Sequence, residues 1–197
     1  MSSIRKITPL IAPIRTIPHD IFRDNNPTLE ELEHRPRMPV VALLDNIRSM
    51  WNVGAMFRSA DGAWIEELIL GGYTATPPRQ EISKTALGSE YSVPWRHTDH
   101  SVMAIKALQK RGYQAVALEH TTRSNSYTDI QYQFPLVFVV GNEGVGVQDE
   151  VAAACGLAVE IPQFGMKSSL NVAVAFGVMI YEVRRQWTAL QRQMQQA

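Results

Sequence analysis

The segment Ile161-Pro-Gln-Phe-Gly-Met-Lys-Ser-Ser-Leu-Asn-Val-Ala-Val-Ala175 runs without a break from a turn-rich loop into an apolar helix. Pro162 and Gly165 predict an irregular loop, whose exposed backbone amides can hold a ligand. Ser169 and Asn171 add short polar side chains where the helix begins, and the first backbone N–H groups of a helix lack partners within it. An ordinary strand–loop–helix corner would have the same pattern, so the rest of the chain has to distinguish the two interpretations.

Upstream of this segment, short apolar strands alternate with helices. Strands are expected at residues 40–44, 67–70, 93–97, 115–118, 136–140 and 158–161, and helices at residues 52–61, 82–87, 101–110, 149–155 and 169–193. This alternation predicts an α/β fold, in which a mostly parallel sheet has helices on both faces. Residues 39–197 form this domain, and residues 1–38 are expected to be a proline-rich N-terminal extension. The extension should hold one short helix, with Pro27 at its first helical position.

The composition is that of a globular protein without a strong charge preference. Hydrophobic residues make up 45% of the chain, and 19 basic side chains balance 19 acidic ones. A protein that held nucleic acid mainly by bulk charge would be basic, so an RNA contact would have to come from a local patch. Cys155 is the only cysteine, which excludes an intrachain disulfide and indicates a reducing compartment. Because the sequence has no signal-peptide pattern and no apolar run of membrane-spanning length, we expect a cytoplasmic protein.

The predicted helix at residues 52–61 carries the first candidate functional side chains. We expect Asn52 to be its N-cap, and Gly54, Arg58 and Asp61 to lie on the face opposite its apolar stripe. Gly54 would then leave open space beside Arg58, so that a ligand could approach the guanidinium closely. The alternative is an exposed Arg58 that pairs with Asp61 at i+3, an interaction that stabilises a helix by only a few tenths of a kcal/mol.

The segment Val139-Val-Gly-Asn-Glu-Gly-Val-Gly-Val147 places three glycines at the carboxyl end of a buried strand, where open α/β sheets bind ligands. Its spacing fits neither the G-x-G-x-x-G dinucleotide motif nor the Walker phosphate loop. Glu143 would repel a phosphate, but it can accept hydrogen bonds from an amine or from the loop itself. His97 and His100 have no third ligand at a suitable spacing, so we expect no metal site.

The helix that follows the opening segment is apolar on nearly all sides from Leu170 to Tyr181. A helix of this kind must be buried, either in the core or against a second subunit. In a small α/β domain, a dimer is the more economical explanation.

These segments, in this order and at these spacings, resemble the SpoU branch of the SPOUT RNA methyltransferases, also called the TrmH-like family. The family motifs are Asn-x-Gly-x-x-x-Arg, a strand followed by Gly-x-Glu-x-x-Gly, and Ile-Pro-x-x-Gly-x-x-x-Ser-Leu-Asn-Val. They are matched, in order, by Asn52, Gly54 and Arg58; by Gly141, Glu143 and Gly146; and by Ile161, Pro162, Gly165, Ser169, Leu170, Asn171 and Val172. The resemblance covers roughly residues 39–185.

The resemblance implies a deep trefoil knot in the C-terminal part of the domain, and a homodimer formed through the C-terminal helix and the knot region. It also implies S-adenosylmethionine as cofactor and methyl transfer to a ribose 2′-hydroxyl of an RNA substrate, either tRNA or rRNA. The implied cofactor-binding residues are Leu118, Thr121, Gly141, Asn142, Gly146, Ile161, Ser169 and Leu170. The implied catalytic residues are Arg58, Asn52, Glu143, Ser169 and Asn171.

In the family, the arginine of the first motif is proposed as the base, and that residue would be Arg58. Because arginine keeps its proton up to a pKa above about 12, we expect Arg58 to position the ribose and to stabilise its developing oxyanion. One alternative is a non-catalytic RNA-binding module with the same fold. Another is a nucleotide-dependent oxidoreductase, which the missing glycine fingerprint disfavours. Trp51 could stack on an RNA base or simply pack, and basic residues of the N-terminal extension could contact RNA phosphate.

Overall fold

The computed structural model describes Thr16 and residues 27–196, which fall into two units that meet between Arg35 and Pro36. The first unit contains helix α2 (Leu29–Glu33), capped by Thr28. The Thr28 hydroxyl accepts a hydrogen bond from the backbone of Glu31, whose carboxylate accepts one from the backbone of Thr28. The prediction that Pro27 begins the helix is therefore wrong, because the cap follows it. The rest of the predicted extension, residues 1–15 and 17–26, lies outside the described residues, and so do most of its basic side chains.

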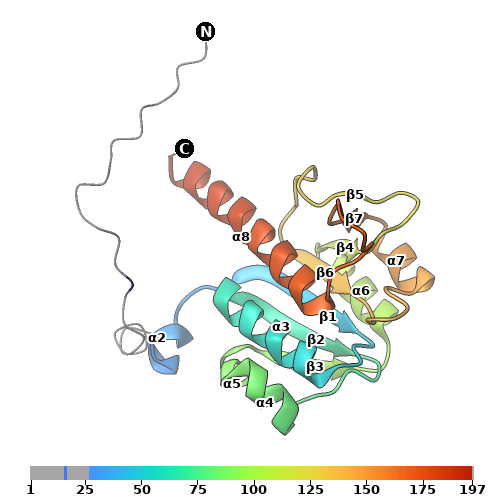
Figure 1. The fold of residues 1–197 in the computed structure, drawn as a ribbon. Helices are drawn as coiled ribbons and strands as arrows, with labels where there is room; N and C mark the ends of the chain where they lie inside the picture. Colours follow the sequence, from blue (N-terminus) through green and yellow to red (C-terminus); the bar gives the residue numbers. More distant parts are fainter. Residues whose placement is uncertain (1–15, 17–26, 197) are drawn as a thin grey trace. The chain divides into compact units, whose positions relative to one another are not determined.

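The second unit is an α/β domain (Figure 1). Its strands are β1 (Met38–Asp45), β2 (Ile65–Gly71), β3 (Trp95–Thr98), β4 (Gln114–Leu118), β5 (Asn125–Ser126), β6 (Leu136–Val140) and β7 (Ala158–Glu160). Its helices are α3 (Met50–Ala63), α4 (Gln80–Ala86), α5 (Ser89–Ser92), α6 (Ser101–Lys110), α7 (Asp149–Cys155) and α8 (Val172–Gln196). Within the described residues, the strands form one sheet in the order β3-β2-β1-β6-β4-β7-β5, and every paired strand is parallel to its neighbour. The predicted parallel α/β architecture is confirmed.

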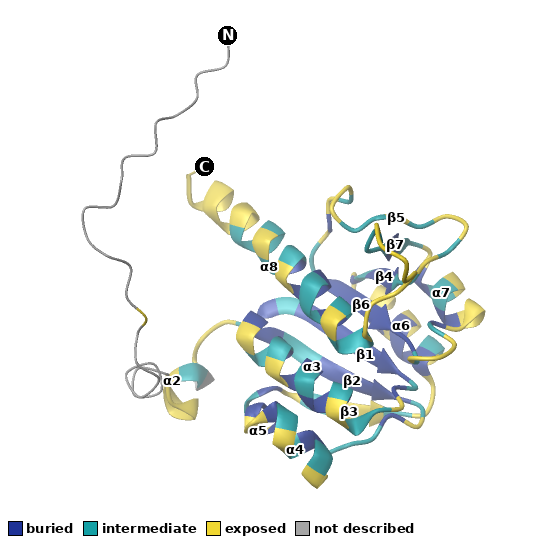
Figure 2. Cartoon of the chain, in the orientation of Figure 1, coloured by how far each residue is buried: buried dark blue, intermediate teal, exposed yellow. Residues whose placement is uncertain are grey.

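Alternating side chains of the central strands pack against helices on opposite faces of the sheet. Val40, Ala42 and Leu44 belong to the hydrophobic cluster that also contains residues of α3, α4 and α8. Val41 and Leu43 belong to a second cluster, with residues of α6 and α7. Figure 2 shows the strands buried between these two helical layers. Burial on both faces explains why the strand sequences are continuous apolar runs.

Helix α3 is longer at both ends than the sequence predicts. Ser49 is its N-cap, and the Ser49 hydroxyl accepts a hydrogen bond from the backbone N–H of Asn52 at 3.4 Å. The prediction that Asn52 caps the helix is therefore wrong, and the Asn52 side chain is free to reach the loop after β6. At the other end the helix runs past residue 61 to Ala63, where Trp64 adopts the left-handed conformation with φ of 52°.

Helix α8 begins at Val172, three residues later than predicted. Its first turn is capped by the side chain of Asn171, whose Oδ1 accepts hydrogen bonds from the backbone of Ala173 at 2.9 Å and Val174 at 3.3 Å. Ser169 consequently lies in the loop rather than in the helix. An asparagine side chain that satisfies two otherwise unpaired N–H groups is a typical helix start.

One side of α8 packs on the sheet and another side stays open. Phe176 is fully buried, and its ring centroid lies 5.3 Å from that of Phe138 in β6. Val174 and Tyr181 are 52% and 54% exposed. The core therefore explains only part of the apolar surface of α8. Among the helices of the described residues, none combines the length and the apolar character that a membrane span requires.

Candidate active site

Three loops that are distant in the sequence meet in a cavity of about 700 Å³ at the carboxyl ends of β4, β6 and β7. The lining comes from residues 118–120, 140–146, 160–163 and 168–172, together with Ala175. Of the residues predicted to bind a cofactor, those that line the cavity are Leu118, Gly141, Asn142, Gly146, Ile161, Ser169 and Leu170. Thr121 does not line it; the Thr121 backbone N–H donates a hydrogen bond to the hydroxyl of Ser124.

At the mouth of this cavity, Glu143 and two asparagines form a hydrogen-bonded network. The Glu143 carboxylate accepts hydrogen bonds from Asn52 Nδ2 at 2.7 Å and from the backbone N–H groups of Arg48 and Ser49 at 2.8 and 3.0 Å. Asn171 Nδ2 donates to Asn52 Oδ1 at 3.1 Å. Four predicted catalytic residues, Asn52, Glu143, Ser169 and Asn171, are thus gathered at one place, and Ser169, Asn171 and Glu143 line the cavity itself.

The network determines the protonation of Glu143. Partial burial pushes the pKa of this carboxyl upward, but the hydrogen bonds from Arg48, Asn52 and Ser49 outweigh burial and hold the pKa below its usual range. Glu143 is consequently an anion at neutral pH. In the folded protein, the Glu143 carboxylate joins the loop after β6 to the start of α3.

Asn142 and two glycines shape the loop after β6. Asn142 Nδ2 donates to the backbone oxygen of Asn46 at 2.9 Å and to the hydroxyl of Tyr73 at 2.7 Å. Asn142 and Gly146 also pair through their backbones, so the loop folds back on itself. A Cβ on Gly141 would lie 2.3 Å from the backbone of Gly146, and Gly146 has a φ of 70°. Both positions therefore require glycine.

Arg58 lies outside the cavity of its own chain, on the exposed surface of α3. Two predictions about its surroundings are wrong. Gly54 is buried against α4, where a Cβ would lie 2.3 Å from the carbonyl oxygen of Ile82, so this glycine admits a neighbouring helix rather than a ligand. Asp61 accepts a hydrogen bond from the hydroxyl of Ser92 at 2.5 Å, and the ion pairs of the described residues do not include Arg58 with Asp61.

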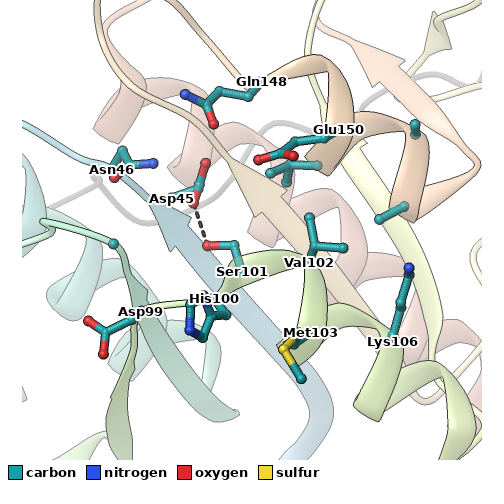
Figure 3. Close-up of a pocket in the computed structure, with 14 residues that line it drawn as sticks. Asp45, Asn46, Asp99, His100, Ser101, Val102, Met103, Lys106, Gln148 and Glu150 are labelled. Carbon is teal, nitrogen blue, oxygen red and sulfur yellow. Dashed lines mark hydrogen bonds between the residues drawn. The ribbon is translucent and has the colours of Figure 1, made fainter.

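A second cavity, of about 720 Å³, lies on the opposite face of the sheet between α6 and α7 (Figure 3). Asp45, at the end of β1, is 2% exposed there, and its Oδ1 accepts a hydrogen bond from Ser101. Its Oδ2 has no partner among the described residues. None of the residues matched to the three motifs lines this cavity. The motif residues therefore select the cavity at β4, β6 and β7 as the candidate active site.

A comparison with known families decides the relationship. The sequence profile described as the SpoU rRNA Methylase family matches residues 39–181, most of the chain. The chain belongs to this family. The resemblance inferred from the three motifs is thereby confirmed.

Individual members of the SpoU family are similar to most of this chain. A tRNA (guanosine(18)-2′-O)-methyltransferase of Aquifex aeolicus is 31% identical over 80% of this chain and 74% of its own length. The 23S rRNA (guanosine-2′-O-)-methyltransferase RlmB of Pseudomonas aeruginosa is 30% identical over 88% of this chain and 69% of its own. The crystal structure of an AdoMet-bound rRNA methyltransferase from Sinorhizobium meliloti superimposes with a TM-score of 0.70 and 32% identity, over 77% of this chain and 58% of that chain.

The cavity lining of this SpoU-family chain also contains two further acidic residues: Glu119, which lies between the predicted residues Leu118 and Thr121, and Glu160, which the sequence did not point to. Glu119 accepts hydrogen bonds from two backbone N–H groups, one of them in the loop after β6 at 2.7 Å. Glu160 pairs with Nδ1 of His120 at 2.5 Å, and a hydrogen bond from Ser124 is the main reason that the pKa of Glu160 is lowered. With Glu143, these side chains give the lining three acidic groups, and its one other titratable side chain is His120. Glu119 and Glu160 belong to none of the three motifs, and no spacing in the sequence indicates that they meet.

Proposed function

We propose that this protein is an S-adenosylmethionine-dependent RNA methyltransferase that methylates a ribose 2′-hydroxyl. The observation that carries the proposal is the Asn52–Glu143–Asn171 network at the mouth of a cavity formed by three loops. The SpoU family and the activities named for its relatives in Aquifex aeolicus and Pseudomonas aeruginosa support the reaction. Those two names also support tRNA or rRNA as the class of substrate, and we place the reaction in the cytoplasm because these RNAs are used there.

The residues of the cavity fit this cofactor. A volume of about 700 Å³ is in the range for a small-molecule site, which is about 300–1,000 Å³. The cofactor carries a sulfonium, an ammonium and a carboxylate, so its net charge is positive, and Glu119, Glu143 and Glu160 supply the opposite charge around the cavity. When bound, it supplies an activated methyl group. Leu118, Gly141, Asn142, Gly146, Ile161, Ser169 and Leu170 are the residues of the lining that we propose to hold it.

Arg58 is the residue that we propose to act on the ribose. Its guanidinium holds a permanent positive charge, so it can orient the 2′-hydroxyl and stabilise the oxyanion that develops as the proton leaves. Asn52, Glu143, Ser169 and Asn171 would position the RNA and the first turn of α3. Because Arg58 is exposed and does not line the cavity of its own chain, we propose that it serves the cavity of a second copy.

Exposed apolar side chains support a homodimer formed through α8 and the segment that precedes it. Phe164 and Met166 in that segment are 97% and 98% exposed, and Val174 and Tyr181 add apolar surface on α8. A monomer would have to expose all of these side chains to water, whereas a second copy would cover them. Size-exclusion chromatography with light scattering should give twice the chain mass. A monomer at micromolar concentration would contradict the dimer and the shared site together.

We propose that the domain is residues 39–197 and that its C-terminal part is knotted. The support is the position of β7, which lies between β4 and β5, two strands that precede it in the sequence. The chain reaches β7 from α7 on one face of the sheet and continues to α8 on the other face. We propose that this path passes through the β4–β5 connection, which ordinary folds do not do. A crystal structure of the protein in which the C-terminal segment does not thread through a loop of the chain would contradict the knot.

Two experiments test the proposal. The first follows label from S-adenosylmethionine into total RNA with the wild type and with Arg58→Ala; transfer by the wild type and its loss in the variant are expected. RNA binding without transfer would instead support the non-catalytic module. The second mixes Arg58→Ala with Ile161→Trp, which places a bulky ring in the cavity and removes none of the hydrogen bonds that position α3; by this account both variants are inactive. If Arg58 serves the partner's cavity, mixed dimers regain activity, and a mixture that stays inactive would place Arg58 in the site of its own chain.

A further inference from the structure

Trp51 and Arg58 lie along the same outward-facing line of α3. They are seven positions apart, so on an α-helix they point within about 20° of each other and are separated by about 10 Å along the axis. On either side of this line, residues of α3 pack against other helices. Gly54 packs on α4, and Ser59 Oγ lies 3.8 Å from a Cβ built on Gly177 of α8. Trp51 and Arg58 therefore face solvent between α4 and α8.

Trp51 is exposed although the fold could bury a tryptophan. Its side chain is exposed, with 49% of the residue surface accessible, whereas Trp64 is buried and Trp95 and Trp187 pack against the core. An exposed aromatic ring of this kind is available to stack on the flat face of a nucleic-acid base. Packing in the core therefore explains Trp64, Trp95 and Trp187, but it does not explain Trp51, for which the sequence allowed either packing or stacking on a base.

The Trp51 ring lies beside the side chain of Lys84, and the Trp51 backbone is hydrogen-bonded to α4 next to the candidate active site. The backbone oxygen of Trp51 accepts a hydrogen bond from Thr85 Oγ1 at 3.0 Å. Lys84 Nζ lies 5.7 Å from the centroid of the Trp51 ring, within the range of a cation–π contact. The next residue, Asn52, donates to Glu143. Lys84 and Thr85 of α4 thus contact the ring and the backbone of Trp51, respectively.

We propose that Trp51 and Lys84 form a binding site for an unpaired RNA base about one to three nucleotides from the ribose that Arg58 holds, since about 10 Å of helix separates the two side chains and stacked nucleotides rise about 3.4 Å each. The base stacks on the Trp51 ring and Lys84 contacts an adjacent phosphate, as single-stranded nucleic acids bind to aromatic and basic side chains. This inference rests on the proposed function. Because the chain has no net charge, stacking supplies binding that bulk electrostatics does not.

RNA affinity is the direct test, measured by fluorescence anisotropy with unfractionated tRNA and with a short single-stranded oligoribonucleotide. Trp51→Ala should weaken binding of both probes about 5- to 150-fold, and Trp51→Phe should weaken it less. Lys84→Ala should lower the slope of log affinity against log salt by about one. Met103→Ala is the matched control, since it removes an exposed apolar side chain on the opposite face of the sheet and should change nothing.

Three further readouts separate the possible causes. S-adenosylmethionine affinity should be equal in the wild type and in Trp51→Ala, and the variant should have a raised KM for RNA with kcat less affected. Unchanged RNA affinity in Trp51→Ala would overturn the base site alone. So would a variant that becomes monomeric, because Trp51 would then belong to the subunit interface. A wild type that binds RNA through Trp51 yet transfers no methyl group would defeat the proposed function and leave the base site standing; a wild type that binds no RNA would defeat both.

Discussion

Replacing Gly54 with alanine should destabilise the protein, although alanine is the better helix former. In an exposed helix interior the change would stabilise by about 1 kcal/mol. Here the new Cβ would lie 2.1 Å from Thr85 Oγ1 and 2.3 Å from the carbonyl oxygen of Ile82. The carbonyl belongs to the backbone of α4, so the two helices must separate. Overpacking of this kind costs about 1–3 kcal/mol, and loss of the hydrogen bond from Thr85 to Trp51 adds about 1 kcal/mol. The net expectation is a loss of about 1–3 kcal/mol.

Gly177→Ala is the matched control for this experiment. Gly177 also lies inside a helix, but the nearest atom that its Cβ would meet is Ser59 Oγ at an ordinary 3.8 Å. The helix propensity of alanine should therefore dominate, and this variant should gain up to about 1 kcal/mol. Urea denaturation at one protein concentration measures both free energies of unfolding. If Gly54→Ala proved as stable as the wild type, the close approach of α3 and α4 would be refuted as the reason for this glycine.

Three other predictions concern charge and burial. The folded-state pKa of Glu143 is lowered, so its contribution to stability is present above the unfolded-state pKa of about 4.3 and is lost as the pH falls through the lower folded-state value. The stability advantage of wild type over Glu143→Gln should therefore be constant above about pH 5 and should decline as the pH falls below the unfolded-state pKa, as measured by urea titrations. Ser101→Ala should lower the free energy of unfolding by about 1–3 kcal/mol or more, because Asp45 would be buried without a hydrogen bond. Asp45→Asn should lower it by less, and equal losses in the two variants would contradict the role of Ser101. Burial, and next the charge of Asp45, raise the pKa of Cys155 to about 12, so native protein at pH 8 should react slowly with a thiol reagent, at a rate that unfolding in urea restores.

The strands and most helices follow from hydrophobic pattern. Residues 136–140 were predicted without error as a strand, because a strand that is buried on both faces has no polar position to blur its ends. The ends of α3 and α8 were less accessible to prediction. Asn52 looks like an N-cap, but its side chain bonds to Glu143, which lies 91 positions away in the sequence. Contacts at that separation leave no local trace.

The sequence motifs include most of the residues that line the candidate site. Seven of the eight residues predicted to bind a cofactor line one cavity, and the eighth, Thr121, lies outside the lining. The orientation of Gly54 could not be inferred, since helical spacing does not say which neighbouring helix lies on which side. Glu160 could not be predicted, because it belongs to no motif and only the order of strands in the sheet brings it beside Glu119.

The most direct test of the account is the chemical position of the transferred methyl group. The purified protein is incubated with RNA and S-adenosylmethionine that carries an isotope-labelled methyl group. The RNA is then digested to nucleosides, which are identified by mass spectrometry. We predict label in a 2′-O-methylnucleoside, and none when Arg58→Ala replaces the wild type. Label on a base, or transfer by Arg58→Ala at the wild-type rate, would contradict the account.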